Sequence, residues 1–385
     1  MAIDLTRRHF VSGVAGLTTA SMLSKAAFAA GPIDIGFLMP LTGGSGKLGN
    51  MMMAGASLAI DEINSAGGVE GRQLRLLPED SQGLARNGID GYRKLVDVDG
   101  ARVLVTGWTA VVVGVAPLAE RDGVYLLSAS TASPAVRGIS PNFQSTWMYA
   151  DDSAKQILPY ARNVLKASKL GILTIVSDLG TGISKAVHKD WTEAGGKVIV
   201  EETHQIDETN FRAVMLKMIA AGPEAIYITT STGKQAAQIV RQARELGYQG
   251  YFISFGAFED PEVLSIGEKA TKCFFSTPAF DAATSDVNAR AFVESFKAKN
   301  GAPPNVHQAN HYDLIRLYAE IARAIAKGGD KISADNFRAA FKAKFPTYEG
   351  VGGNYAFNFN DGSVRRSEFV KTVANGRFVK VADLT

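Results

Sequence analysis

The stretch IGFLMPLTGGSGKLG at residues 35–49 decides the fold, because it runs from an apolar segment into a glycine-rich turn. The apolar run at residues 33–39 predicts a buried β-strand. Residues 54–64 then carry apolar side chains at helical spacing, and Gly67-Gly68 ends that predicted helix. A buried strand followed by a helix predicts the first part of a βαβ unit, and therefore a parallel sheet.

The same alternation of strand and helix continues along the chain and restarts near residue 151. It predicts an α/β fold of two similar lobes joined by two or three hinge strands. The other strands are expected at residues 73–80, 103–106, 124–128, 169–176, 197–204, 225–230, 251–254, 272–275, 355–358, 369–373 and 378–381. The other helices are expected at residues 87–98, 111–121, 152–165, 183–194, 211–221, 235–246, 288–299, 310–327 and 334–344.

The first 29 residues have the composition of an export signal. Arg7-Arg8 precede an apolar run at residues 10–23, and Ala27-Phe28-Ala29 matches a small-residue cleavage site. Residues 6–11 resemble the twin-arginine export motif, and a general secretory signal is the alternative. We expect cleavage after Ala29 and a periplasmic product. No later apolar run is long enough to span a bilayer.

Composition excludes several classes of function. The chain has 41 Lys and Arg against 38 Asp and Glu, without a basic stripe, which argues against a nucleic-acid partner. Cys273 is the single cysteine, so an internal disulfide is impossible, and its apolar surroundings predict a buried structural thiol. His307 and His311 lack the spacing of a zinc site with Cys or Glu. We therefore expect a monomer that is not an enzyme and has no cofactor or metal.

The segment Gly44-Ser45-Gly46-Lys47-Leu48-Gly49 matches the G-x-G-x-x-G pattern of dinucleotide sites. Four residues separate it from the strand, and the acidic pair Glu79-Asp80 lies about 30 residues beyond it rather than the usual 20 or so. We favour a loop that lines a small-ligand cleft. A plain turn is one alternative, and an exported NAD(P)-dependent oxidoreductase that uses this loop is another.

Polar and aromatic residues follow several of the predicted strands, at the edge where parallel α/β sheets bind ligands. Hydroxyls and free N–H groups at this edge suit a carboxylate or amide oxygen, and aromatic side chains can form apolar walls. Helix capping is the alternative role for each Ser and Thr, and core packing for each aromatic residue. The candidate ligand-binding residues are Trp108, Thr109, Ser130, Thr131, Tyr149, Asp178, Thr181, Thr232 and Phe255.

Four segments resemble the periplasmic leucine/isoleucine/valine-binding proteins of ATP-driven importers: residues 35–43, 55–72, 79–82 and 239–247. The resemblance implies the type I periplasmic binding protein fold, with two Rossmann-like lobes and three hinge crossings. Residues 30–147 plus 279–350 would form the N-terminal lobe, and residues 148–278 plus 351–385 the C-terminal lobe. It also implies closure of the lobes on a small-molecule ligand and docking on the permease subunits of an ABC transporter.

The resemblance also implies which residues hold the ligand. In the family the ligand carboxylate is held at positions matching residues 109–111 and Ser130-Thr131. The usual serine run is replaced here by residues 110–113, Ala-Val-Val-Val, so we place the carboxylate on Ser130 and Thr131. The family's acidic partner for an α-ammonium group is missing from residues 255–257, and Glu259 is displaced. We therefore expect a carboxylate- or amide-bearing solute that is amino acid-like, aromatic, or without an α-ammonium group. A sensory binding protein is an alternative to an importer component.

Overall fold

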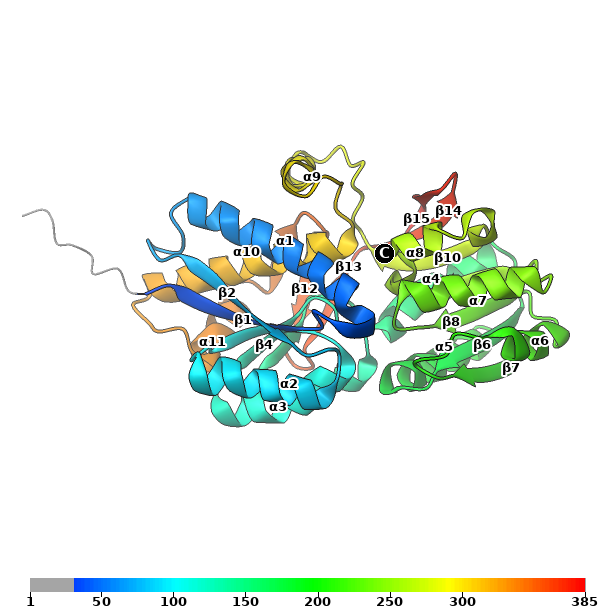
Figure 1. Cartoon of the computed structure of the whole chain (residues 1–385), viewed down its shortest axis with the longest axis horizontal. Helices are drawn as coiled ribbons and strands as arrows, with labels where there is room; N and C mark the ends of the chain where they lie inside the picture. Colours follow the sequence, from blue (N-terminus) through cyan, green and yellow to red (C-terminus); the bar gives the residue numbers. More distant parts are fainter. Residues whose placement is uncertain (1–30, 385) are drawn as a thin grey trace, which may run out of the picture.

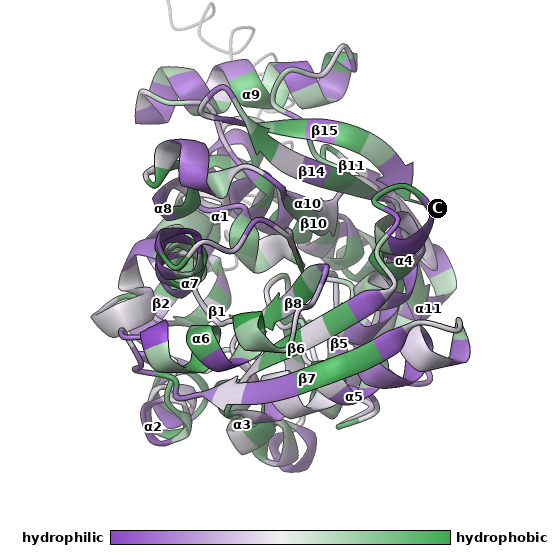
Figure 2. Cartoon of the chain, turned by 90° about the vertical axis from the view of Figure 1, so that its right-hand side faces the viewer, coloured by the Kyte–Doolittle hydropathy of each residue, from purple (hydrophilic) through white to green (hydrophobic). Residues whose placement is uncertain are grey.

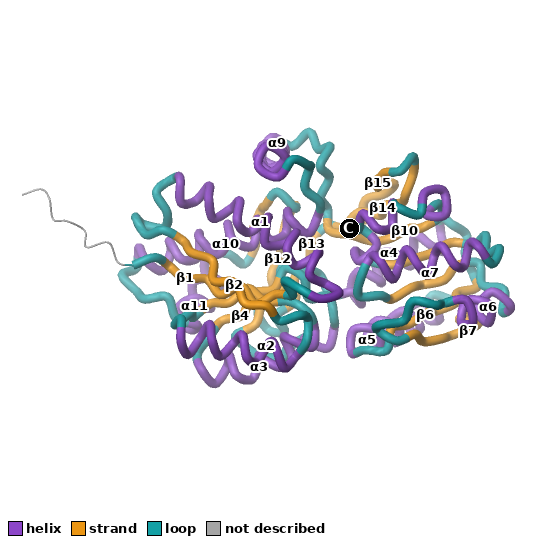
Figure 3. The backbone as a smooth tube through the Cα atoms, viewed as in Figure 1, coloured by secondary structure: helices purple, strands orange, loops and turns teal. Residues whose placement is uncertain are grey.

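The computed structural model describes residues 31–384, so the predicted export signal and its cleavage site lie outside the described residues. Two α/β lobes lie end to end along the longest axis (Figure 1). In each lobe, helices cover both faces of a central sheet (Figure 3). The predicted fold of two Rossmann-like lobes is confirmed. Within residues 31–384, no helix combines the length and the apolar character needed to cross a bilayer.

The N-terminal lobe contains a five-stranded parallel sheet in the order β2-β1-β3-β4-β5. One apolar cluster joins α1, α10 and α11 to one face of this sheet, and a second joins α2 and α3 to the other. The strands are β1 (Ile33–Met39), β2 (Leu74–Asp80), β3 (Val103–Thr106), β4 (Tyr125–Ser128) and β5 (Phe143–Ser145). The helices are α1 (Gly46–Ser65), α2 (Ala85–Arg93), α3 (Thr109–Asp122), α10 (Val306–Lys327) and α11 (Ala334–Lys344).

The C-terminal lobe contains a seven-stranded sheet in the order β15-β14-β10-β9-β8-β6-β7. Strands β6 to β10 are parallel as predicted, and the hairpin β14–β15 joins them antiparallel. Every residue of β8 is buried, in the apolar middle of the sheet (Figure 2). The strands are β6 (Lys169–Ile175), β7 (Lys197–His204), β8 (Ala225–Thr229), β9 (Tyr251–Ser254), β10 (Cys273–Pro278), β14 (Glu368–Ala374) and β15 (Arg377–Leu384).

Helices cover both faces of the second sheet as well. One apolar cluster joins α4 and α5 to one face, and another joins α6, α7 and α8 to the other. Cys273 is buried in the second cluster, and burial raises the pKa of its thiol to about 12, as expected for a structural cysteine. The helices are α4 (Ala150–Asn163), α5 (Asp178–Glu193), α6 (Arg212–Ala220), α7 (Gly233–Glu245) and α8 (Pro261–Leu264). Helix α9 (Val287–Asn300) packs instead in the apolar cluster of the N-terminal lobe that contains α1 and α10.

Residues 347–366 form a small antiparallel sheet that the sequence did not predict as a unit. Its strands are β11 (Thr347–Gly350), β12 (Gly353–Asn358) and β13 (Ser363–Arg366). Phe357 packs edge-on against Phe341 of α11, with ring centroids 4.8 Å apart. The Tyr355 hydroxyl donates to Asp313 of α10 over 2.7 Å. Residues 351–366, which we predicted to belong to the C-terminal lobe, therefore pack on helices of the N-terminal lobe.

The described chain passes between the lobes three times, and one buried arginine ties two of these crossings together. Arg366 is the last residue of β13, at the third crossing, and is 4% exposed. It donates to the carbonyl of Thr146 at the first crossing over 3.0 Å, and to Asn310 of α10 over 2.6 Å. Its other terminal nitrogen donates to the Gly352 carbonyl over 2.7 Å. Arg366 therefore fixes both the hinge and the position of α10.

Replacing Arg366 by methionine keeps a long side chain but removes the guanidinium group. The carbonyls of Thr146 and Gly352 then stay buried without partners, and Asn310 Oδ1 keeps only the Tyr355 hydroxyl, so the free energy of unfolding should fall by about 3–5 kcal/mol. Urea titration followed by circular dichroism measures the change. The matched control is Arg365→Met on the same strand, which is exposed and should change stability by less than about 0.5 kcal/mol. Equal stability of the two variants would contradict the role of Arg366.

Candidate ligand-binding site

A small cavity lies between the lobes, at the carboxyl ends of both parallel sheets. It encloses about 90 Å³ accessible to the centres of water molecules. Since one water needs about 10–15 Å³ by this measure, the cavity has room for several waters or for one small solute. Its walls are mostly apolar, with hydroxyls and one imidazole among them. They are formed by Leu48, Met52, Trp108, Thr109, Ser130, Ala132, Trp147, Leu179, Thr230, Ser231, Phe255, Ala257 and His307.

The N-terminal lobe contributes a free hydroxyl and a helix start. Ser130 Oγ is buried and has no hydrogen-bond partner within the chain. A Cβ atom at Gly107 would overlap this oxygen, so glycine is required beside it. Trp108 has a φ of +63°, a strained value for a residue with a side chain, and directly precedes α3. The N–H groups of the first turn of α3 have no partners within the helix, so they suit a negatively charged oxygen.

Aromatic side chains form much of the wall. Trp147 lies at the first hinge crossing and stacks on His307, with ring centroids 5.2 Å apart and planes at 7°. The Trp147 ring packs against Gly256, where a Cβ would lie 2.8 Å from it. Phe255 follows β9 directly and brings a ring from the C-terminal lobe. The cavity therefore has flat apolar surfaces from both lobes.

Four of the predicted site residues line this cavity: Trp108, Thr109, Ser130 and Phe255. The other five lie outside it. Thr131 is buried and accepts a hydrogen bond from Ser128 Oγ over 2.7 Å. Thr232 caps α7 by accepting from Gln235 N, and its neighbours Thr230 and Ser231 reach the cavity instead. The side chains of Asp178 and Thr181 are exposed on α5, whose Leu179 lines the cavity.

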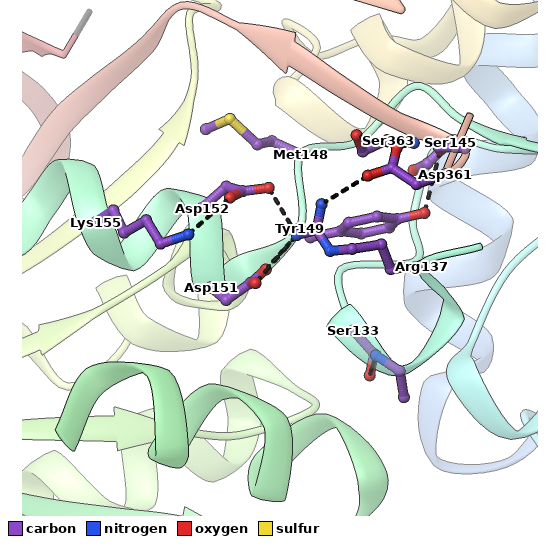
Figure 4. Close-up of polar contacts among 12 residues, drawn as sticks. Ser133, Arg137, Ser145, Met148, Tyr149, Asp151, Asp152, Lys155, Asp361 and Ser363 are labelled. Carbon is purple, nitrogen blue, oxygen red and sulfur yellow. Dashed lines mark hydrogen bonds and ion pairs between the residues drawn. The ribbon is translucent and has the colours of Figure 1, made fainter. Parts of the chain in front are cut away.

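Tyr149 is not among the lining residues and belongs to a polar cluster with Arg137 and Asp361 (Figure 4). Its hydroxyl donates to the Gly362 carbonyl over 3.1 Å, and the guanidinium of Arg137 lies 4.8 Å from the centre of its ring. Arg137 also pairs with Asp151 and Asp152, in the first turn of α4. This arginine therefore links the segment after β4 in the N-terminal lobe to a helix of the C-terminal lobe.

Sequence reasoning did not identify His307 as a ligand-binding residue. In the structure it is 7% exposed and lines the cavity beside Trp147, on which its ring stacks. The helix that carries it begins at Val306, four residues before the predicted start. Asn305 Oδ1 accepts from the N–H groups of His307 and Gln308, and the Gln308 side chain accepts from Asn305 N. This capping box is visible in the sequence and could have placed His307 at the cleft. Residues 31–384 contain no group of three or more His, Cys, Asp or Glu arranged to hold a metal ion.

Burial keeps both histidines of α10 neutral. It lowers the pKa of His307 to about 3, with a smaller contribution from His311. It lowers the pKa of His311 to about 4, against the opposing effect of the hydrogen bond between its Nδ1 and the His307 carbonyl. His307 therefore offers the cavity an uncharged ring near neutral pH.

No acidic side chain lines the cavity among the described residues. Glu259, the displaced acidic residue noted in the sequence, is buried and paired with Lys371 of β14 over 2.6 Å. Its other oxygen accepts from Thr277 over 2.7 Å. An α-ammonium group in the cavity would therefore lack a counter-charge, which is costly in a buried site.

The glycine motif at residues 44–49 packs on its own chain. A Cβ atom at Gly49 would overlap the Pro40 carbonyl, so this glycine serves a close approach within the loop. Asp80 accepts hydrogen bonds from the N–H groups of Leu41 and Gln82. Its carboxylate therefore fixes the segment that leads into the glycine motif. Leu48, from within the motif, lines the cavity. These contacts support the small-ligand loop over the dinucleotide site.

Two hinged α/β lobes around a small interlobe pocket define the class of solute-binding proteins. A family model described as "Periplasmic binding protein" matches residues 32–377, and the chain belongs to that family. The leucine-, isoleucine-, valine-, threonine- and alanine-binding protein of Pseudomonas aeruginosa is 26% identical over 95% of this chain and 94% of its own. The predicted resemblance to the leucine/isoleucine/valine-binding proteins is confirmed.

Solved structures show the same fold. The branched-chain amino acid binding protein LivJ of Streptococcus pneumoniae, in complex with isoleucine, is 26% identical with a TM-score of 0.80, covering 91% of this chain and 100% of that one. A solute-binding protein of an R. palustris ABC transporter, in complex with benzoate, is 18% identical with a TM-score of 0.81, covering 92% and 96%. The second likeness is one of fold alone.

The two buried histidines predict how stability depends on pH. The unfolded chain protonates them near pH 6.5, whereas the folded protein holds them neutral down to about pH 4. The free energy of unfolding therefore decreases as the pH falls from about 6.5 to 4, by about 1.4 kcal/mol per pH unit for each histidine. Burial raises the pKa of Glu368 to about 7, which acts in the opposite sense, so variants must be compared with the wild type.

Urea titrations at several values between pH 4.5 and 7.5 test this dependence. His307→Phe should reduce the change in the free energy of unfolding with pH by about 1.4 kcal/mol per pH unit, and His311→Phe should reduce it by the same amount. The control is Val113→Ala on the exposed side of α3, because it removes no titratable group and should leave the slope unchanged. Slopes that are identical in all four proteins would contradict the assignment.

Proposed function

We propose that this protein captures a compact carboxylic acid without an α-ammonium group in the periplasm and delivers it to the permease of an ABC importer. The observation that carries the proposal is the interlobe cavity, in which aromatic walls surround a buried free hydroxyl and no acidic side chain among the described residues. Simple aromatic acids fit this description best.

The proposed carboxylate site uses neutral donors. Ser130 Oγ is buried without a partner, and Thr109 begins α3 beside the cavity, so a hydroxyl and helix N–H groups are available to one anion. Hydrogen bonds to a charged group are stronger than those between neutral groups, and the helix dipole favours an anion at this end. These donors offset the cost of burying a carboxylate, but they cannot offset the cost of burying an ammonium group, which needs acceptors.

The flat walls and the size of the cavity favour an aromatic ring. The indoles of Trp108 and Trp147 and the ring of Phe255 line the same space. Aromatic pairs gain about 0.5–1.5 kcal/mol beyond the burial of their area. The cavity of about 90 Å³ suits a compact solute such as a single-ring acid. The amino acids named for the relatives have the right size but bring an ammonium group.

The mechanism follows from contacts that span the cleft. Pro134, in the short helix after Ser130, packs against Gly182 of α5 in the other lobe. Lys47, in the glycine motif, pairs with Glu262 of α8 over 3.2 Å. A ligand that touches both lobes favours this closed arrangement, and opening about the hinge releases it unchanged. The closed outer surface is what a permease would recognise.

A ligand panel tests the chemical class. At 100 times its dissociation constant, a ligand that binds only the folded protein should add about 2.7 kcal/mol of stability. We expect benzoate to raise the melting temperature in a thermal-shift assay, with leucine, isoleucine and NADH giving little or no change at equal concentration. Tight binding of leucine and none of benzoate would refute the proposed ligand class while leaving a binding protein in place.

Ser130→Ala tests the carboxylate site. Removing this hydroxyl should weaken benzoate binding by about 1–3 kcal/mol in isothermal titration calorimetry. The matched control is Ser184→Ala on α5, whose hydroxyl donates to the Thr181 carbonyl away from the cavity and should leave the affinity unchanged. Unchanged affinity in Ser130→Ala would place the carboxylate elsewhere.

A further inference from the structure

Among residues 31–384, His307 contributes the one imidazole on the wall of the cavity, and no hydrogen bond between these residues accounts for its ring nitrogens. Nδ1 is buried without a partner, and the side chain as a whole is 7% exposed. Leaving such a nitrogen unpaired costs about 1–3 kcal/mol, so a partner from the ligand is favoured. The ring is also held in place, because it stacks on Trp147 at 5.2 Å and its backbone lies in the first turn of α10.

The chemistry of the ring limits what that partner can be. A neutral imidazole presents one N–H donor and one nitrogen acceptor. A carboxylate can only accept, and it has the Ser130 hydroxyl and the helix N–H groups on the first lobe. A hydroxyl group can donate to the imidazole or accept from it, so it satisfies His307 in either tautomer. An ammonium group would find no counter-charge among the described residues that line the cavity, which makes its burial costly.

We propose that the ligand carries a hydroxyl group in addition to its carboxylate, and that His307 binds this hydroxyl. His307 is then the residue that selects hydroxylated aromatic acids over benzoate. The inference rests on the proposed function, since it needs a carboxylic acid in this cavity. It divides the recognition between two places: the carboxylate at Ser130 and the start of α3, and the hydroxyl at the start of α10.

A site built to hydrogen-bond a hydroxyl discriminates strongly against the analogue that lacks it, because the protein group is then left unpaired. We therefore expect the best of the three monohydroxybenzoates to bind the wild-type protein at least about 10-fold more tightly than benzoate. Isothermal titration calorimetry of the full mature chain with the four acids measures this ratio.

Variants assign the preference to His307. His307→Phe keeps an aromatic ring to stack on Trp147 but has no ring nitrogen, so the ratio of hydroxybenzoate to benzoate affinity should fall to about 1. His307→Asn restores a donor and an acceptor and should recover part of the preference. The matched control is His311→Phe, one turn along α10 and outside the cavity lining, which should keep the wild-type ratio. A ratio that persists in His307→Phe would overturn the assignment.

A second readout does not depend on whether the variants fold. In wild-type protein labelled with ¹⁵N-histidine, the ring nitrogens of His307 should shift on adding the preferred hydroxybenzoate and much less on adding benzoate. Equal binding of all four acids would overturn the inference but leave the proposed function standing. If none of the four acids binds, the proposed function fails and the inference fails with it.

Discussion

The hydrogen bonds of Arg366 are the interaction on which the rest of the structure depends. One buried guanidinium group joins the first hinge crossing at Thr146, the third crossing on which it lies, and Asn310 of α10. Asn310 is one turn from His307, so the same contact that orders the hinge also orients the helix that forms part of the cavity wall. Asp313, on the same helix, accepts from Val351 and Gly352 and anchors the small sheet.

The cavity owes its character to the ends of strands. Parallel β-strands finish at one edge of the sheet, and the turns that follow them leave N–H groups and short polar side chains at that edge. Here β3 is followed by Trp108 and Thr109, β4 by Ser130, and β9 by Phe255. Because the two lobes present these edges to each other, a solute between them is surrounded on several sides by backbone and aromatic groups.

Sequence patterns predicted the local features well and the non-local ones poorly. Strand and helix periodicity predicted most elements, and the turns after strands identified Trp108, Thr109, Ser130 and Phe255 on the cavity wall. Tyr149 was expected there too, but its ring is held outside the cavity lining by Arg137, a contact that no local pattern encodes. His307 was missed because α10 is about 180 residues from Ser130 in the chain and reaches the site only through packing. The strand β5 was missed because it has three residues.

The ion pair between Lys47 and Glu262 joins the two lobes across the cleft, but it is too exposed to hold the closed form by itself. Both side chains are largely in solvent, 64% and 43% exposed. Such a pair contributes about 0–1 kcal/mol, which is too little to hold two domains together. In the proposed function, a solute that contacts both lobes adds closing free energy that this exposed pair does not supply, alongside the contacts of Arg137 with Asp151 and Asp152. A compound that contacts only one lobe would not favour the closed form, so the proposed mechanism selects solutes by how long they stay bound as well as by their affinity.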